Sequence, residues 1–225
     1  MKLVLTCEHG GNDIPKNYKA LFKNEAILNT HRAYDMGALD LFQTLVPLSD
    51  ASYYSTTTRL LVELNRSLHH TRLFSEFSEK LTDLEKTNLI YNHYLPYRRA
   101  VENHIKRFID QGENVLHLSI HSFTPKLDGK TRNCDIGLLY DSANTLEQRF
   151  CRALKSEILK QNSHIKIRFN YPYLGKADGF TTYLRKQFKT NYLGLEIEVN
   201  QKYVLNNTMD SAISQAVFKA LHHVL

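Results

Sequence analysis

Three apolar runs of this sequence each lead to a residue that binds metals or anions. They are the predicted strands 2–8, 59–64 and 115–121, which lead to His9, to Asn65-Arg66 and to His121. In an open α/β sheet, ligands bind beyond the carboxyl ends of the strands. We therefore expect these distant segments to assemble one site.

The two histidines are candidate metal ligands. His9 precedes two glycines, where the backbone can turn sharply and leave the ring exposed to a cleft. His121 ends its strand. His117, Ser119 and His121 alternate along this strand and therefore share one face, with His117 farther from the strand end. Neutral imidazole is a preferred zinc ligand, and catalytic zinc commonly has three protein ligands and a water. Taken alone, His9 could instead be a residue that packs under a loop. His117 is interpreted as a core residue or as a residue that supports a metal ligand.

Carboxylates accompany these histidines. Asp35 stands at the start of the predicted helix 34–46, where it could cap the helix, ligate a metal or hold a metal-bound histidine, and its position favours the cap. Glu196 and Glu198 alternate in the predicted strand 192–199 and share one face. On an internal strand, a carboxylate beside a metal can take a proton from water and pass it to a leaving amine. On an edge strand, the same face would simply meet water.

Arg66 is a candidate for binding an anionic substrate. Its planar guanidinium suits bidentate recognition of a carboxylate, and the adjacent Asn65 adds a second polar contact. The alternative is a surface arginine that pairs with Glu63 or another acid.

A serine or cysteine nucleophile is less favoured, because the sequence has no Gly-x-Ser-x-Gly motif. It also has no P-loop and no dinucleotide-binding fingerprint.

Composition describes an ordinary soluble protein. The 225 residues are 42% hydrophobic and 23% charged, which fits one domain over residues 1–225. No apolar run is long enough to cross a bilayer, and the first apolar run is too short for a signal peptide. Three cysteines without CxxC spacing indicate reduced thiols and a cytoplasmic location.

The chain is basic, with a formal net charge of +6. A nucleic-acid-binding protein would concentrate this excess in a stripe with aromatic residues, whereas here it is spread along amphipathic segments. We expect no nucleic-acid or membrane partner, and the charge is weak support for a small anionic substrate. A soluble basic surface explains the charge equally well, and the oligomeric state stays open.

Apolar runs alternate with segments of helical period, which is typical of α/β proteins. The predicted strands are 2–8, 51–55, 59–64, 115–121, 134–140, 165–169 and 192–199. The predicted helices are 34–46, 82–111, 144–161, 179–189 and 208–224. Pro96 should kink or divide the second of these helices. The turn 126–130 and the loop 170–179 are candidates for the rim of a pocket.

These residues lie in motifs that resemble those of the N-formylglutamate amidohydrolase family, which is related more distantly to zinc carboxypeptidases and aspartoacylases. The motifs are Cys-Glu-His-Gly-Gly-Asn-Asp-Ile-Pro (7–15), Ala-Tyr-Asp-Met-Gly-Ala (33–38), Leu-Asn-Arg (64–66), His-Ser-Phe-Thr-Pro (121–125), Cys-Asp-Ile-Gly-Leu-Leu-Tyr-Asp (134–141) and Leu-Glu-Ile-Glu-Val-Asn-Gln (195–201). They occur in the family's order, so the resemblance covers most of the chain.

The resemblance implies a three-layer α/β/α fold with a mixed, mostly parallel central sheet. It also implies a zinc-dependent hydrolase of an N-acyl bond on an amino acid. By the matching motifs, His9 and His121 would bind the metal, and Asn65 and Arg66 would bind a carboxylate or carbonyl oxygen of the substrate. Glu198 matches the catalytic glutamate more closely than Glu196 does.

The third metal ligand stays open. Zinc carboxypeptidases have a glutamate three residues after the first histidine, whereas this chain has Asn12, and asparagine is a poor zinc ligand. Asp35 or Asp13 could replace it.

We therefore expect a cytoplasmic, metal-dependent amidohydrolase that acts on an N-acylated acidic amino acid, with N-formylglutamate as the reference substrate. Zinc would polarise the acyl oxygen, and Glu198 would move the proton. Arg66, with Asn65 and Arg59, would bind the substrate carboxylate or the oxyanion. One alternative is a zinc peptidase or deacylase of another N-acyl amino acid, and a second is a non-catalytic binding protein that retains the pocket.

Overall fold

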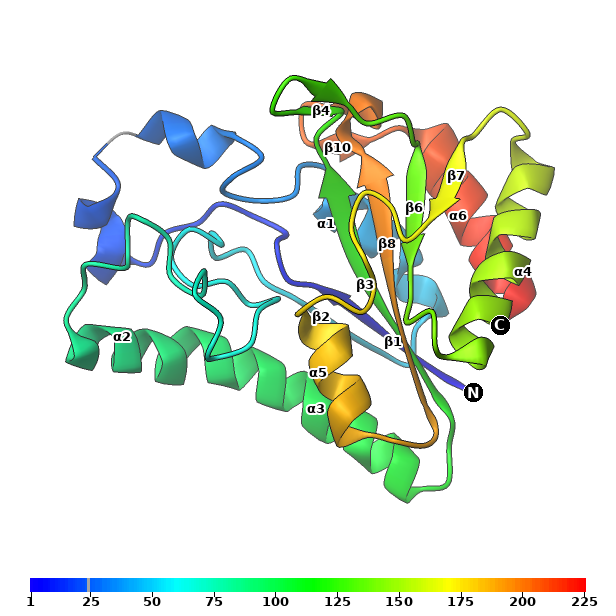
Figure 1. Cartoon of the computed structure of the whole chain (residues 1–225), viewed down its shortest axis with the longest axis horizontal. Coiled ribbons are helices and arrows are strands. Elements are labelled where there is room, and N and C mark those ends of the chain that lie inside the picture. The colour runs from blue at the N-terminus through cyan, green and yellow to red at the C-terminus, as the bar shows by residue number, and fades with distance from the viewer. Residues whose placement is uncertain (24) are drawn as a thin grey trace.

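A six-stranded sheet forms the centre of the molecule (Figure 1). The computed structural model describes residues 1–23 and 25–225. The sheet strands are β1 (Lys2–Cys7), β2 (Ala51–Tyr54), β3 (Val115–Phe123), β6 (Ile136–Leu139), β7 (Ile167–Phe169) and β8 (Tyr192–Asn200). Their order is β2-β1-β3-β8-β6-β7, and all neighbours are parallel except β6 and β8. The prediction of a mixed, mostly parallel sheet is confirmed.

Helices cover both faces of this sheet (Figure 1). The helices are α1 (Ala38–Leu45), α2 (Asp83–Leu89), α3 (Leu95–Asp110), α4 (Thr145–Gln161), α5 (Phe180–Gln187) and α6 (Ser211–Val224). Apolar residues of α1, α4 and α6 pack together with one face of the strands, and apolar residues of α3 and α5 pack against the other. The α/β fold is therefore confirmed.

The two faces of the sheet differ in polarity. Because side chains alternate along a strand, Leu116, Leu118 and Ile120 of β3 join the core beneath α1, α4 and α6. The opposite face carries His117, which exchanges hydrogen bonds of 2.8 Å with the Thr6 and Tyr192 hydroxyls. His117 is thus a core residue, as expected, and a row of buried polar side chains continues from it toward the carboxyl ends of the strands.

The predicted strand 59–64 is wrong. Residues 59–61 form a turn, in which Leu61 donates to the carbonyl of Thr58 at 3.0 Å. Leu60 and Leu61 belong to one small hydrophobic cluster outside the main core, and Leu64 belongs to another. These leucines are therefore buried by packing against other side chains and not by strand pairing in the sheet. A short apolar run has no periodicity that distinguishes these two outcomes.

The predicted helix 82–111 is divided, as Pro96 indicated. A π-helical turn, Ile90–Tyr94, joins α2 to α3, and Pro96 lies in the first turn of α3. A proline is tolerated there because the first N–H groups of a helix have no intrahelical acceptor.

Shorter elements connect the larger ones. They are the 3-10 helices Lys16–Leu21, Glu25–Asn29, Val46–Leu48 and Gln201–Tyr203, and the two-stranded ribbons of β4 (Lys126–Leu127) with β5 (Lys130–Thr131) and of β9 (Val204–Leu205) with β10 (Thr208–Met209). All three cysteines are free and buried. Within residues 1–23 and 25–225, no helix has both the length and the apolar character needed to span a membrane.

Candidate active site

His9, Asp35 and His121 converge at the carboxyl ends of β1 and β3. The Nδ1 atom of His121 lies 2.9 Å from Oδ2 of Asp35, and Nδ1 of His9 lies 3.3 Å from the same oxygen. The two imidazole rings are tilted, with centroids 5.0 Å apart. All three side chains are buried, and one donor atom from each lies within 4.8 Å of the others. This group has the composition and spacing of a metal site.

The remaining ring nitrogen of each histidine is held by a carboxylate. Nε2 of His9 contacts Oε1 of Glu63. Nε2 of His121 lies 3.3 Å from Oε2 of Glu8 and 2.7 Å from the Ser119 hydroxyl. Metal-binding histidines are usually oriented by such a bond, which leaves the opposite nitrogen as the metal donor. Both Nδ1 atoms are thereby directed to one point.

Asp35 does not cap helix α1. The N-cap residue is Gly37, and the helix begins at Ala38, so the favoured capping role is wrong. The Asp35 carboxylate instead bridges the two histidines and accepts a hydrogen bond of 3.2 Å from Arg59. Although burial favours the protonated form, His9 and His121 hold the pKa of Asp35 well below its usual value. Asp35 is therefore an anion between two imidazoles.

The structure does not support Asn12 as a metal ligand. Asn12 lies in the irregular segment that follows β1. Its side-chain amide donates to the backbone carbonyl of Leu28 at 2.8 Å and to the side-chain oxygen of Asn29 at 3.4 Å. Asp13, the other alternative, is exposed, and its backbone pairs with Thr57. Of the residues considered for the third ligand, Asp35 is the one that joins the buried group.

Glu198 and Glu196 lie on the polar face of β8, which is internal in the sheet. Glu196 accepts a hydrogen bond of 2.8 Å from the Thr181 hydroxyl. Glu198 pairs in register with His121, and its Oε2 atom is buried without a hydrogen-bond partner among the described residues. Burial raises the pKa of Glu198 to about 8, because the charged carboxylate loses hydration. Its position beside the histidines and its unpaired oxygen suit proton transfer.

The loop 170–179 approaches the carboxylates of β8, and its place at the rim of a pocket stays a prediction. A Cβ atom added to Gly137 would lie 2.0 Å from the Tyr171 carbonyl oxygen and 3.3 Å from Cβ of Glu198. A Cβ atom on Gly179 would lie 3.3 Å from the Asn65 amide oxygen. The loop backbone therefore approaches the sheet so closely at Gly137 that a side chain there would displace it.

Asn65 and Arg66 follow a turn instead of a strand, and of the two it is Asn65 that contacts a histidine of the site. The Asn65 amide nitrogen lies 3.4 Å from Nε2 of His121, and its amide oxygen accepts the Phe180 N–H at 2.7 Å. Arg66 donates from its guanidinium to the carbonyl of Asp178. Arg59, the third predicted substrate-binding residue, donates to Glu63 at 2.7 Å and to Asp35 at 3.2 Å. The negative charges of Glu63 and Asp35 raise the pKa of Arg59 despite its burial.

A comparison with known protein families covers most of the chain. A family model described as N-formylglutamate amidohydrolase matches residues 1–205, the part of the chain that contains every residue of the site. The chain belongs to the N-formylglutamate amidohydrolase family. A search of curated proteins finds no match.

Two solved structures resemble this chain over nearly its whole length. A gene product of Agrobacterium tumefaciens is 25% identical and superposes with a TM-score of 0.83, over 99% of this chain and 91% of that chain. An N-formylglutamate amidohydrolase from Ralstonia eutropha JMP134 is 15% identical, with a TM-score of 0.73 over 100% of this chain and 94% of that chain. The α/β/α arrangement of the whole chain is thus similar to that of a solved N-formylglutamate amidohydrolase.

In this member of the family, the sequence analysis gave no role in the site to three residues that belong to it: Glu8, Ser119 and Glu63. Glu8 and Ser119 were detectable in principle, since strand alternation places Ser119 on the face of His121, and Glu8 adjoins His9. The Ser119 hydroxyl donates to Oε2 of Glu8 at 2.5 Å. Glu63 gave no such signal, because it lies in the turn segment that was taken for a strand.

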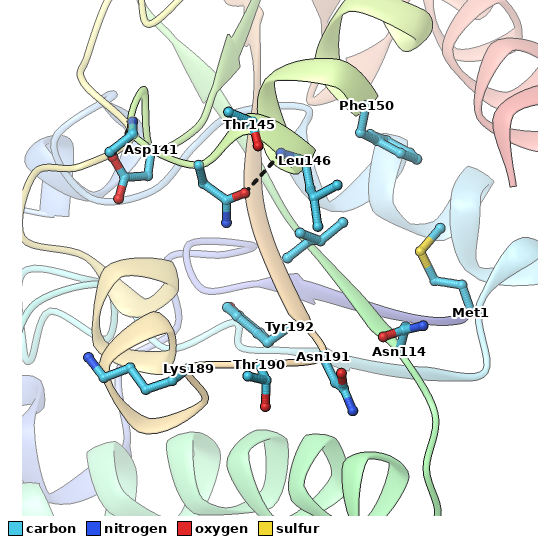
Figure 2. Close-up of a pocket in the computed structure, with 13 residues that line it drawn as sticks. Met1, Asn114, Asp141, Thr145, Leu146, Phe150, Lys189, Thr190, Asn191 and Tyr192 are labelled. Atoms are coloured by element: carbon cyan, nitrogen blue, oxygen red, sulfur yellow. Dashed lines mark hydrogen bonds between the residues drawn. The ribbon is translucent and has the colours of Figure 1, made fainter.

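A separate cavity of about 860 Å³ lies at the opposite end of the sheet (Figure 2). Met1, Asn114 and Tyr192 line it at the amino ends of β1, β3 and β8, and Leu146 lines it from the first turn of α4. Its lining contains no histidine and no glutamate. The chemistry expected of this amidohydrolase family therefore belongs to the carboxyl ends of the strands.

Proposed function

We propose that this protein is a zinc-dependent hydrolase that removes the N-acyl group, in the reference case formyl, from an acidic amino acid such as N-formylglutamate. Family membership supports amidohydrolase activity. The observation that carries the zinc proposal is the approach of two Nδ1 atoms, from His9 and His121, to one carboxylate oxygen of Asp35.

The donor set fits zinc by its chemistry. Two imidazole nitrogens and one carboxylate are a common ligand set of catalytic zinc, which keeps a further position open. Glu63 and Glu8 hold the opposite ring nitrogens and so set the orientation of both rings. When bound, zinc supplies Lewis acidity, which polarises an acyl carbonyl and makes water more acidic.

Glu198 is proposed to transfer the proton. Its unpaired Oε2 accepts a proton from the attacking water, whose oxygen forms the new bond to the acyl carbon. The same carboxyl then gives this proton to the nitrogen as the C–N bond breaks, releasing formate and the free amino acid. A pKa raised toward neutrality by burial suits a group that must both accept and donate.

Asn65 and Arg66 are proposed to bind the substrate. Both approach from the segment beside His121, and Arg66 forms no ion pair with a carboxylate among the described residues. Its guanidinium therefore retains donors for a substrate carboxylate. Arg59 instead contacts Asp35 and Glu63, so we propose that it keeps these carboxylates ionised and in place.

The test is hydrolysis of N-formyl, N-acetyl and N-succinyl amino acids by zinc-loaded protein, with N-formyl-L-glutamate as the reference. We expect formate release that is lost on treatment with a chelator and restored by zinc. Hydrolysis of another N-acyl amino acid alone would favour the wider deacylase alternative. Substrate binding without turnover by zinc-loaded protein would favour the non-catalytic binding protein.

A further inference from the structure

Arg132 is an arginine at the site that the proposed mechanism does not use. It lies between β5 and β6, and its backbone N–H donates to the carbonyl of Pro125 at 2.8 Å. The Asn200 side chain, two residues beyond Glu198 on the same face of β8, approaches the Arg132 carbonyl at 3.5 Å and donates to that of Cys134 at 2.8 Å. The backbone of Arg132 is therefore held beside the carboxyl ends of β3 and β8.

The guanidinium of Arg132 lies against two aromatic rings. Its central carbon is 5.8 Å from the ring centroid of Phe123 and 5.2 Å from that of Tyr173. Phe123 is two residues beyond His121 and shares its face of β3. The guanidinium thus lies on the side of the sheet that carries the metal-site histidine.

The Arg132 guanidinium also hydrogen-bonds the Tyr173 hydroxyl, and other N–H donors of the group remain available. A guanidinium has five N–H donors. One of them, on Nη1 of Arg132, donates a long hydrogen bond of 3.5 Å to the backbone carbonyl of Thr124. Within the described part of the chain, Arg132 forms no ion pair with a carboxylate. The contacts with the rings of Phe123 and Tyr173 position the guanidinium, and its N–H donors can still bind a further group.

Tyr173 connects this arginine to Glu198. It belongs to the loop 170–179, whose backbone at Tyr171 passes over Glu198, and 46% of Tyr173 is exposed. Partial burial and the charge of Glu198 raise the pKa of the Tyr173 phenol, whereas Arg132 opposes this change. Tyr173 therefore contacts Arg132 and lies near enough to Glu198 to be influenced by its charge.

We propose that Arg132, together with the Tyr173 hydroxyl, binds the side-chain carboxylate of the substrate and so selects acidic N-acyl amino acids. This inference rests on the proposed function and assigns the acidic side chain to a specific subsite. The substrate has two carboxylates, and two arginines, Arg66 and Arg132, form no salt bridge with a carboxylate among the described residues, although the charge of Arg66 lowers the pKa of Asp178. Arg66 takes the α-carboxylate, and Arg132 takes the other.

The test compares N-formyl-L-glutamate with N-formyl-L-glutamine, which has the same shape without the charge. For Arg132→Gln we expect kcat/KM on the glutamate substrate to fall about 10- to 100-fold, the range of a charge-assisted hydrogen bond. We expect a change of less than about threefold on the glutamine substrate, because a neutral amide makes weaker bonds. Arg132→Lys should keep part of the preference, and Tyr173→Phe should lose a smaller part than Arg132→Gln.

Arg152→Gln, an exposed arginine on α4, is the matched control and should leave both rates unchanged. Equal losses on both substrates, or no loss on either, would overturn the subsite. Melting curves identify variants that fail to fold, and Arg132→Lys then carries the comparison.

A binding measurement separates this inference from the proposed function. Calorimetry with L-glutamate and L-glutamine on zinc-loaded protein should show a preference for glutamate that Arg132→Gln removes. If the parent hydrolyses neither substrate but this preference is present and depends on Arg132, the reaction is wrong and the subsite stands. If binding does not depend on Arg132, the subsite is wrong whatever the reaction.

Discussion

Nδ1 of His121 lies 2.9 Å from Oδ2 of Asp35, although 86 residues separate them in the chain. Burial would lower the pKa of His121, but its hydrogen bonds to Asp35 and Glu8 raise the pKa well above the usual value. Protonated His121 therefore balances the charge of Asp35 and Glu8, and a metal ion bound at these side chains would replace its proton.

Replacing His121 by alanine should abolish high-affinity zinc binding, because one of two imidazole donors is lost. The measurement is zinc content and zinc titration on folded protein. His164→Ala removes an exposed histidine and is the control that should bind zinc as the parent does. Equal zinc binding by His121→Ala would reject the site.

Replacing Glu63 by glutamine should weaken zinc binding about 10- to 100-fold without abolishing it, because Glu63 orients His9 through Nε2 and does not belong to the donor group. Competition with a chelating dye measures the affinity. Glu76→Gln changes another arginine-paired glutamate, one that is half-exposed at the surface, and should have no effect. An unchanged affinity in Glu63→Gln would remove this orienting role.

Replacing Glu198 by glutamine should lower kcat about 10²- to 10⁴-fold, because an amide cannot accept the proton from water. Zinc content should stay near that of the parent. Glu196→Gln is the matched variant and should lower kcat less, since Glu196 is bonded to Thr181. If Glu196→Gln is inactive and folded while Glu198→Gln is active, the two roles must be exchanged, and if both are active the proton acceptor lies elsewhere.

Replacing Arg66 by lysine should lower kcat/KM about tenfold on every active substrate, because the charge remains but the planar fork is lost. Steady-state kinetics on the N-formyl substrates measures this change. Arg99→Lys, which alters a neighbouring exposed arginine on α3, should leave the kinetics unchanged. Unchanged kinetics in Arg66→Lys would exclude Arg66 from substrate binding.

His117 should make the protein less stable at acidic pH. Burial lowers the pKa of His117 to about 4, whereas an unfolded histidine has a pKa near 6.5. Between these values the unfolded chain binds a proton that the folded chain does not, so the free energy of unfolding falls as pH falls. The shift corresponds to about 3 kcal/mol at pH 4.

Urea unfolding of chelator-treated protein at pH 7 and pH 4.5 measures this dependence. His117→Gln should be less stable at pH 7, because the hydrogen bonds to Thr6 and Tyr192 change, but should lose less stability between the two pH values. His164→Gln should keep the parent's dependence. The same pH dependence in His117→Gln and the parent would show that other groups cause it.

The fold and part of the site followed from local patterns. Alternation placed His117, Ser119 and His121 on one face of β3, and the two glutamates on one face of β8. Whether the strand of the glutamates is internal was decided by the sheet order, in which β8 lies between β3 and β6. Helical periodicity located α4 and α6 to within a few residues of their observed ends. Alternation and helical periodicity depend on neighbours in the chain, which is why the sequence alone could show them.

The tertiary structure decided which residues complete the site. Asp35 joined the histidines instead of capping a helix, and Glu63 reached His9 from a turn that the apolar pattern had suggested was a strand. Arg132 and Tyr173 met across two loops. Irregular backbone has no period, and its course depends on packing between segments tens of residues apart. The sequence alone therefore located the six strands of the sheet and the histidines and glutamates on them, and only the folded chain decided the strand order and which loop residues contact the site.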